Sequence, residues 1–233
     1  MASRVQTGNH APKRIVGDKV LRFSKGERLS HWVHAISFFV LLITGLGVYS
    51  SFFQPAMAIF GGIHVAQLIH RIAAVFFVVV VGLLFFVGNP RFHWRWLKFT
   101  FNFTKADLQH VSAFPKEFFG GHGNYPAQDK YNGGEKINSL ITIFGTLFIT
   151  LSGIVMWWAP HFPPGLVRWA YPVHDLSMFM MTAAAMGHIY LSLLHPDSRV
   201  AMSGMLNGYV STKFAQAHHA KWYERLKNEQ QNL

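Results

Sequence analysis

The 233-residue chain contains no cysteine, and only 13% of its residues are charged. The absence of cysteine excludes disulfides, thiolate zinc sites, iron–sulfur clusters bound by this chain, thiol nucleophiles and covalently attached haem. Soluble domains contain about 25% charged residues on average, so the low charge argues against an ordinary soluble enzyme. A metal or haem centre in this chain would have to be held by its 14 histidines.

The sequence instead contains long apolar runs, and 51% of its residues are hydrophobic. A hydrocarbon core of about 30 Å is crossed by about 20 helical residues. Four runs reach that length, at residues 32–53, 65–87, 137–158 and 172–194, and they contain almost no charge. We therefore predict an all-α membrane protein, a four-transmembrane-helix bundle that forms one domain over residues 1–233.

The net charge of +11 could indicate a nucleic-acid-binding protein, but the positions of the charges argue against it. Of the 21 lysines and arginines, all but Arg71 and Arg168 fall in residues 1–31, 88–136 and 195–233. The positive-inside rule then predicts that these three segments and both termini are cytoplasmic. We expect a multi-pass protein of the bacterial inner membrane, in contact with lipid and without a nucleic-acid partner.

The segment between the second and third spans begins with interleaved basic and aromatic residues, from Arg91 to Phe99. Such rings and cations suit the lipid headgroup layer. We predict an interfacial helical segment there. Glycine-rich stretches at residues 120–124 and 132–134 should then break the helix and return the chain to the third span.

Six histidines lie in the predicted spans or at their entrances. They are His31, His34, His64, His70, His174 and His188. Ionisable side chains at membrane depth are costly and usually face a partner inside the bundle. His174 and His188 are 14 residues apart, about 40° short of four full turns, so they share a helix face about 21 Å apart. That separation is too long for a binuclear metal site and suits two haems, one near each membrane surface.

The directions of the spans pair the histidines by depth. His31 and His188 fall near the cytoplasmic face, and His70 and His174 fall near the outer face. The pattern predicts two bis-histidine haems, whose six-coordinate irons transfer electrons and offer no position to a substrate. Each histidine taken singly is also explained as a polar residue that is hydrogen-bonded between helices.

Three further residues near these sites have more than one interpretation. His34 competes with His31, lines the same pocket or contacts a haem propionate, and His64 stands in a similar relation to His70. Arg71 either neutralises a propionate or anchors the topology.

Several motifs resemble one known family. They are Leu29-Ser30-His31-Trp32, Leu68-Ile69-His70, the turn at residues 130–136, the His174 and His188 pair, and the tail from Ser203 to Tyr223. They resemble the cytochrome b gamma subunit of membrane-bound formate dehydrogenase of the formate dehydrogenase-N type, over residues 22 to 227. The Tyr-Asn-Gly-Gly turn and the His-His-x-x-Trp-Tyr tail are its most specific parts. His34 and Arg71 depart from the family pattern.

The resemblance implies a place in an electron-transfer complex. A molybdenum or tungsten pterin alpha subunit would oxidise formate, and an iron–sulfur beta subunit would pass the electrons to this chain. Within it, His70 and His174 would bind an outer haem b, and His31 and His188 an inner haem b that reduces menaquinone or ubiquinone. Asn132 and Gly133 would adjoin the quinone pocket. The family also assembles as higher oligomers of heterotrimers, and the gamma subunit has no formate chemistry of its own.

Two other functions stay open from the residues alone. One is a related cytochrome b that serves a hydrogenase or a thiosulfate/polysulfide reductase. The other is a haem-free transporter or proton channel that uses its histidines directly. Lys130, Glu135, Lys136 and His195 are interpreted as solvated surface charges, with proton delivery as the alternative.

Overall fold

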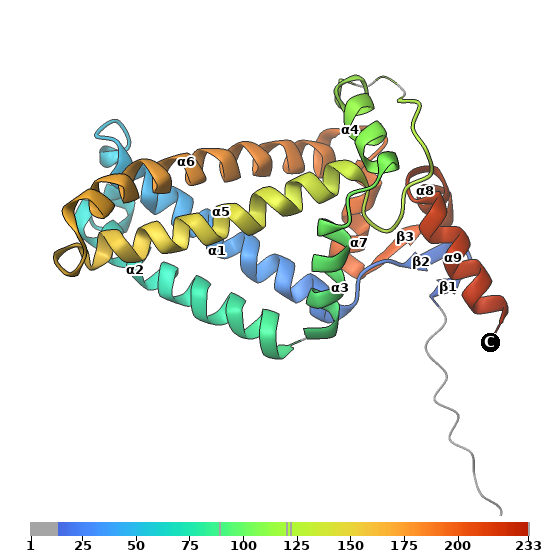
Figure 1. Cartoon of the computed structure of the whole chain (residues 1–233), viewed down its shortest axis with the longest axis horizontal. Helices are drawn as coiled ribbons and strands as arrows, with labels where there is room; N and C mark the ends of the chain where they lie inside the picture. The colour runs from blue at the N-terminus through green and yellow to red at the C-terminus, as the bar shows by residue number, and fades with distance from the viewer. Residues whose placement is uncertain (1–13, 89, 120, 122, 233) are drawn as a thin grey trace, which may run out of the picture.

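The computed structural model describes residues 14–88, 90–119, 121 and 123–232, and residues 1–13 of the predicted cytoplasmic tail lie outside the described part. Four long helical segments run alongside one another (Figure 1). They are α1 (Lys25–Tyr49), α2 (Ile63–Phe76), α5 (Gly133–Trp157) and α6 (Pro164–Ile189). Together with the helical extensions of α2 and α6, they are long and apolar enough to cross a membrane, which confirms the predicted four-helix membrane fold.

Two of the four segments continue in π-helical geometry. α2 runs on through η2 (Phe77–Val81) and η3 (Leu84–Gly88), and α6 runs on through η5 (Tyr190–Leu194). π-helical turns widen the helix locally by shifting the backbone hydrogen bonds to the fifth residue. The second span therefore reaches Gly88 and the fourth reaches Leu194, close to the ends predicted from hydropathy.

The helices begin earlier than hydropathy alone predicts, because capping residues set where they start. Before α1, Glu27 N–H donates to Ser24 Oγ at 3.3 Å, and Ser24 N–H donates to Glu27 Oε2 at 2.6 Å. Asn132 and Glu135 form the same reciprocal cap at the start of α5. A capping box satisfies N–H groups that have no partner within the helix. The caps lie outside the apolar runs, so hydropathy marks only the central part of each helix.

The predicted start of the fourth span at residue 172 was too late. α6 begins at Pro164, and Pro172 lies inside the helix. Proline suits the first turn, where its missing N–H would have had no helical partner anyway. Within membrane helices an internal proline is tolerated because neighbouring groups satisfy the freed carbonyl.

The connections at one end of the bundle, which we call the hairpin end, are short. After α1 ends at Tyr49 rather than at residue 53, η1 (Gln54–Phe60) leads to α2, and η4 (Ala159–His161) joins α5 to α6. Gly61 and Gly62 have φ values of 97° and 102°, a left-handed region that only glycine adopts easily. These two glycines let the chain turn back alongside α1.

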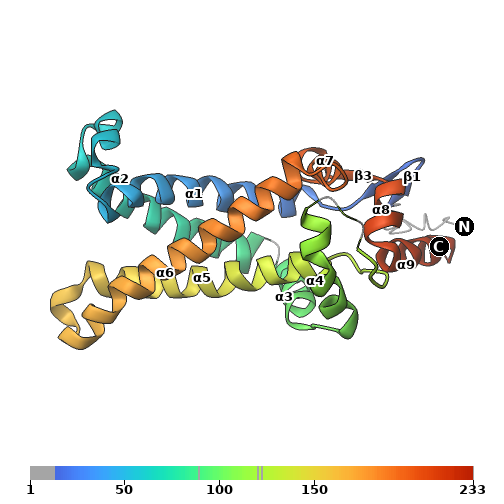
Figure 2. The ribbon, with the colours of Figure 1, turned by 90° about the horizontal axis from the view of Figure 1, so that it is seen from above.

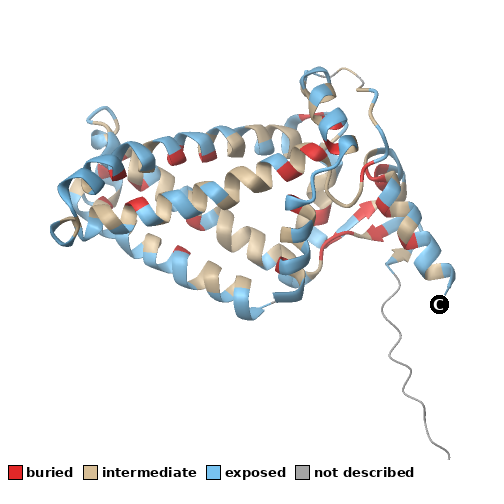
Figure 3. Cartoon of the chain, in the orientation of Figure 1, coloured by how far each residue is buried: buried red, intermediate tan, exposed pale blue. Residues whose placement is uncertain are grey.

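The helices pack most closely in two pairs, α1 with α2 and α5 with α6. In the view of Figure 2, α6 crosses α5, and its last turns lie above the first turns of α1. Most surfaces of the four helices are exposed and apolar, while the buried positions are mainly small or polar (Figure 3). This pattern is expected where lipid, rather than water, covers the outside of a bundle.

At the opposite end, which we call the tail end, two helices cross the bundle. They are α3 (Pro90–Phe101) and α4 (Lys105–Phe118), and both pack against α5. Trp96 Nε1 donates to Ser139 Oγ of α5 at 3.3 Å. These helices confirm that the segment between the second and third spans is helical, and its place at the membrane interface stays a prediction.

Both described ends of the chain meet at the tail end, in a small unit that the sequence analysis did not predict. Strands β1 (Ile15–Val16), β2 (Lys19–Leu21) and β3 (Tyr209–Ser211) form an antiparallel sheet in the order β1-β2-β3. Helices α8 (Thr212–His218) and α9 (Ala220–Gln231) cover it, whereas η6 (Arg199–Ala201) and α7 (Met202–Asn207) connect it to the fourth span. We call β1–β3, α8 and α9 the tail unit.

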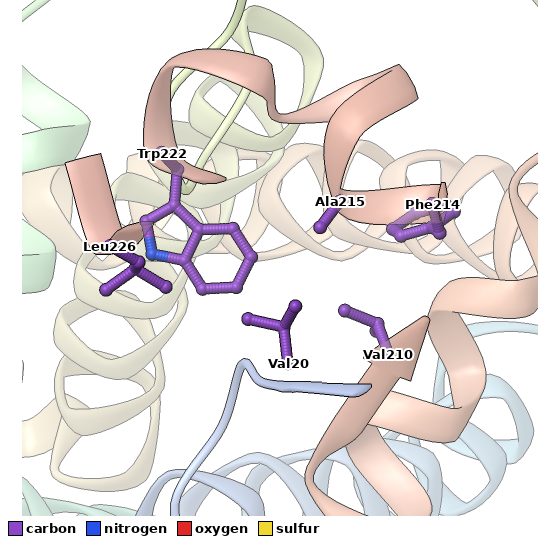
Figure 4. Close-up of a cluster of buried hydrophobic side chains, with 6 residues drawn as sticks. All are labelled: Val20, Val210, Phe214, Ala215, Trp222 and Leu226. Carbon is purple, nitrogen blue, oxygen red and sulfur yellow. The ribbon is translucent and has the colours of Figure 1, made fainter. Parts of the chain in front are cut away.

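The tail unit has its own apolar core (Figure 4). Its buried members are Val20, Val210, Phe214, Ala215, Trp222 and Leu226. Strands of two or three residues are too short to show an alternating pattern in the sequence. Burial of Trp222, which is 1% exposed, ties the C-terminal helix to the strand that precedes α1.

Candidate functional site

His31 and His188 face each other near the tail end. The ring of His31, on α1, has its centre 6.1 Å from that of His188, on α6, and the two ring planes differ by 57°. A metal–nitrogen bond of about 2 Å on each side, with about 1 Å more to each ring centre, separates two axial imidazoles by about 6 Å. The observed spacing therefore fits two histidines that ligate one iron between the helix pairs.

His34, the competitor of His31, points toward a different neighbour. Its ring centre lies 5.2 Å from that of Phe77, in the extension of α2. The structure thus brings His31 next to His188 and packs His34 against the second span. His31 itself stands edge-on to Trp32, with ring centres 5.2 Å apart, and its Nδ1 is buried without a hydrogen-bond partner among the described residues.

His70, on α2, and His174, on α6, lie toward the hairpin end and belong to different helix pairs. The Nδ1 atom of His70 is 3.0 Å from Thr44 Oγ1, whose hydroxyl donates to the carbonyl of Val40 at 2.7 Å. Because the hydroxyl proton is used there, Thr44 accepts from the ring, and His70 carries its proton on Nδ1. The other ring nitrogen, Nε2, keeps a free lone pair for a metal.

His174 has the same surroundings on the other helix pair. Its Nδ1 is 3.1 Å from Ser152 Oγ, and that hydroxyl donates to the carbonyl of Phe148 at 2.6 Å. Metal-binding histidines commonly donate their second ring N–H to such an acceptor, which fixes both the tautomer and the ring orientation. His70 and His174 are therefore prepared to bind a metal through Nε2.

Each of these histidines also lies against a glycine. A Cβ on Gly45 would be 3.2 Å from Cε1 of His70, and a Cβ on Gly153 would be 3.4 Å from Cε1 of His174. The sequence analysis missed Thr44 and Ser152. The signal that could have found them is the repeated pair Thr44-Gly45 and Ser152-Gly153, a hydroxyl residue followed by glycine on two different spans.

Arg71 and His64 lie at the edges of the bundle. The guanidinium of Arg71 lies 5.8 Å from the ring centre of Trp157 at the end of α5, and Trp157 stacks on Trp158. This contact joins the two helix pairs at the hairpin end and supports the interpretation of Arg71 as an anchor. His64 is exposed near the start of α2.

Asn132 and Gly133 have structural tasks at the start of α5. Asn132 Oδ1 accepts from Glu135 N–H at 2.9 Å, and Asn132 N–H donates to Glu135 Oε2 at 3.0 Å. At Gly133 the backbone passes so close to α4 that a Cβ would overlap the carbonyl oxygen of Asp107. Both residues are therefore explained locally by capping and packing, whatever further role they have.

Among the described residues, four ion pairs cluster at the tail end of the spans, and we call them the charged layer. They are Arg22–Glu135, Glu27–Lys130 and Asp107–Lys136, each at 2.8 Å, and Asp129–Arg225 at 2.7 Å. The side chains of Asp107 and Lys136 are each only 5% exposed. Burial alone would raise the pKa of Asp107, but hydrogen bonds from Lys136 and Thr104 outweigh it and lower that pKa.

The interpretation of Lys130, Lys136 and His195 as solvated surface charges was wrong, whereas the side chain of Glu135 is still 35% exposed although it is ion-paired. Both lysines and Glu135 are in ion pairs of the charged layer, and His195 is 1% exposed with its Nδ1 3.1 Å from Ser198 Oγ. Burial lowers the pKa of Lys130 against the opposing attraction of Glu27. The sequence could not show this, because each partner lies on a different element from the residue it neutralises.

The donor groups fit haem better than a free metal ion. Across the residues that the structure describes, no group of three or more His, Asp or Glu side chains could hold a metal ion. Haem needs only two protein ligands, since the porphyrin supplies the four nitrogens in its plane. The two histidine pairs match that requirement. The ring centres of His31 and His188 are 6.1 Å apart, and the Nδ1 atoms of His70 and His174 each donate to a hydroxyl oxygen.

Comparison with known proteins gives relatives over most of the chain. A formate dehydrogenase cytochrome b556(fdo) subunit of Escherichia coli K12 is 24% identical over 213 residues, 90% of this chain and 94% of the relative. A formate dehydrogenase cytochrome b556 subunit of Haemophilus influenzae is 26% identical, over 88% of this chain and 82% of the relative. A protein of Azospira oryzae, provisionally named as a protein-methionine-sulfoxide reductase subunit, is 25% identical over 75% and 91%.

A family profile matches a larger part of the chain than any single motif does. The profile of the prokaryotic cytochrome b561 family covers residues 22–208. That range contains all four membrane-spanning segments and both histidine pairs. Cytochromes of this type bind b-type haem, which agrees with the donor groups described above. With its four apolar helices, this chain is a bacterial membrane protein that belongs to the prokaryotic cytochrome b561 family.

Proposed function

We propose that this chain is the cytochrome b subunit of a respiratory formate dehydrogenase and that it holds two haem b groups in one membrane domain. The observation that carries this proposal is the facing pair of His31 and His188, with ring centres 6.1 Å apart. Toward the other end of the same helices, His70 and His174 have matching hydroxyl partners at Nδ1, and we assign them to the second haem. The names of the Escherichia coli and Haemophilus influenzae relatives support the choice of formate dehydrogenase.

The proposed haem ligands leave no open coordination position. Bound haem b supplies reversible one-electron transfer between ferric and ferrous iron. His70 and His174 would hold the outer group through Nε2, and His31 and His188 would hold the inner one. With two histidines committed to each haem, the chain would leave no position for oxygen or substrate to bind the iron. The chain is therefore an electron-transfer subunit and does no formate chemistry itself.

The orientation we propose puts the tail end in the cytoplasm and the hairpin end in the periplasm, in the bacterial inner membrane. All but two of the 21 lysines and arginines lie outside the hairpin end of the spans, as the positive-inside rule requires. Electrons would then enter near His70 and His174 and leave near His31 and His188. Movement of one electron across the membrane potential involves about 2.3 kcal/mol per 100 mV.

The partners we propose follow from what this chain lacks. It has no cysteine to bind an iron–sulfur cluster, so the relay from formate must lie in another polypeptide. We assign that relay to an iron–sulfur beta subunit and formate oxidation to a molybdenum or tungsten pterin alpha subunit. The heterotrimer is expected to form a higher oligomer.

The quinone site we propose lies at the tail end, near Asn132 and Gly133. Asn132 Oδ1 is already engaged by Glu135 N–H, so its side-chain NH₂ is the group left to donate to a quinone carbonyl. Gly133 keeps the α4 backbone close to the start of α5. Menaquinone or ubiquinone bound here would receive electrons beside the inner histidine pair.

The experiment that tests this function is purification under mild detergent from the native membrane. We expect two haem b per chain in the reduced-minus-oxidised spectrum, co-purifying pterin and iron–sulfur subunits, and formate-dependent reduction of both haems. Absence of haem would overturn the cytochrome assignment, and one haem per chain would overturn the two-site arrangement. Haem reduction by hydrogen or thiosulfate, without response to formate, would assign a different donor enzyme.

A further inference from the structure

The two histidines of the outer pair are held by matching groups on neighbouring helices. Thr44 of α1 contacts His70 of α2, with 3.0 Å between Oγ1 and Nδ1, and Ser152 of α5 contacts His174 of α6, with 3.1 Å between Oγ and Nδ1. In both cases the hydroxyl residue is followed by a glycine, against which the same imidazole ring packs. The same arrangement of hydroxyl residue, glycine and histidine therefore occurs once in each helix pair.

The direction of these hydrogen bonds is set by the backbone. Both hydroxyls use their protons on carbonyls of the preceding turn, at 2.7 Å for Thr44 and 2.6 Å for Ser152, so both oxygens accept from the rings. Each ring is therefore a donor at Nδ1.

The inner pair differs in this respect. The Nδ1 atom of His31 is buried and has no hydrogen-bond partner among the described residues. Donation from a ring N–H to an acceptor makes the imidazole a stronger base and a better ligand for ferric iron. Hydrogen bonding around the ligands is one of the means by which a protein adjusts a haem potential. The hydroxyl acceptor at each outer histidine therefore favours the ferric state more than the surroundings of His31 do.

We propose that Thr44 and Ser152 are positioning residues that orient His70 and His174 and hold the outer haem at a lower midpoint potential than the inner haem. This inference rests on the two-haem function proposed above. With that order of potentials, one electron would be transferred from the haem held by His70 and His174 to the haem held by His31 and His188. The first haem would be oxidised by one electron as the second is reduced, and no proton would be transferred. Thr44 and Ser152 thereby help to set the direction of transfer toward the quinone.

The test is a potentiometric titration of the haem absorbance in the purified complex, with electron paramagnetic resonance of the ferric haems alongside it. The variants are Thr44→Val and Ser152→Ala, which remove the hydroxyls, and Thr44→Ser and Ser152→Thr, which keep them. Ser37→Ala and Ser177→Ala are the controls. Each control serine is also buried in the bundle and donates to a backbone carbonyl at 2.7 Å.

We expect Thr44→Val and Ser152→Ala each to move the lower-potential haem upward and leave the other haem in place. A tenfold change in the ratio of reduced to oxidised haem at fixed potential, about 59 mV for one electron, is the expected scale. Neither substitution alters the imidazole rings themselves, so the haem should stay bound. Thr44→Ser, Ser152→Thr and both controls should titrate like the wild type.

Several results would overturn the inference while leaving the proposed function intact. The first is that the midpoint potentials of both haems stay unchanged in Thr44→Val and Ser152→Ala. The second is that Thr44→Ser shifts the potential as much as Thr44→Val does. The third is that the Ser37→Ala and Ser177→Ala controls also lose haem. Loss of one haem from Thr44→Val alone, with both retained in Thr44→Ser, supports the positioning role. A wild-type complex with no haem, or with one titrating component, would instead overturn the two-haem function.

Discussion

The imidazole rings of His31 and His188 lie 6.1 Å apart, although the residues are separated by most of the chain and belong to different helix pairs. His188 should therefore be needed for only one of the two proposed haems. His188→Ala is expected to remove the inner haem and quinone reduction, while formate oxidation with an artificial dye continues in the partner subunit. Haem content and the two activities in the purified complex measure this.

The matched control for that variant is His64→Ala, because His64 is exposed near the start of α2. It should keep both haems and full quinone reduction. If His188→Ala lost the dye-linked activity in a complex that still assembles, the division of labour between the subunits would be contradicted.

His34 and His31 should behave differently although they are one helical turn apart. His34 packs on Phe77 with ring centres 5.2 Å apart, whereas His31 faces His188. We expect His34→Gln to retain two haems and His31→Gln to retain one, as measured by the haem-to-polypeptide ratio. Retention of both haems in His31→Gln, together with loss of one in His34→Gln, would make His34 the ligand.

The glycines beside the outer histidines should not accept a side chain without cost. In Gly45→Ala the new Cβ would lie 3.2 Å from Cε1 of His70, so the ring or the helix has to shift by a few tenths of an ångström. We expect a lower occupancy of the outer haem, measured from the reduced spectrum. Gly82→Ala is the control, because a Cβ there meets nothing within 4 Å. Equal haem content in both variants would show that the close approach is unimportant.

Lys136 and Asp107 form a buried ion pair, so the loss of one charge should strongly lower the free energy of unfolding. Lys136→Met leaves a carboxylate that is 5% exposed without its cation, which is expected to cost about 3–5 kcal/mol of unfolding free energy. Arg225→Met, at a pair where the arginine is 41% exposed, should cost about 1 kcal/mol or less. Denaturant unfolding in detergent compares them. The double variant Lys136→Met with Asp107→Asn should recover part of the loss, and no recovery would argue against direct coupling.

The tail unit should loosen in mild acid because it buries a neutral histidine. His219 is 1% exposed and donates from Nδ1 to the Asp129 carbonyl at 2.8 Å. Burial lowers its pKa from 6.5 to about 3. Between those two values the unfolded chain binds the extra proton, so stability falls as pH falls, by up to about 1.4 kcal/mol per pH unit.

Hydrogen exchange of α8 and α9 between pH 7.5 and pH 5 measures this change. His219→Gln removes the titrating group and should flatten the pH dependence over that range. The Asp129 carboxylate does not produce the same effect there. Burial alone would raise its pKa, but hydrogen bonds from Arg225 outweigh that and lower the pKa below 3.8, so its contribution is lost only at lower pH. An unchanged pH profile in His219→Gln would assign the acid sensitivity to another group.

Much of the architecture could be predicted because it depends on features that are local in the chain. Four apolar runs, the basic segments between them and the spacing of His174 and His188 are visible without any tertiary contact. The resemblance added the family, and the profile match over residues 22–208 agrees with it. The helix starts were harder to predict from hydropathy, because caps such as Ser24 with Glu27 lie outside the apolar runs.

The sequence by itself predicted four membrane-spanning helices and pointed to histidine as the proposed ligand for haem, because length, hydropathy and the absence of cysteine leave little choice. Only the tertiary structure decided that His31 faces His188, and that Thr44 and Ser152 accept from His70 and His174. It also showed that Lys130 and Lys136 are buried in ion pairs rather than solvated. The physical reason is that ring orientation, hydrogen-bond direction and charge neutralisation depend on groups from different helices, and only packing brings those groups together.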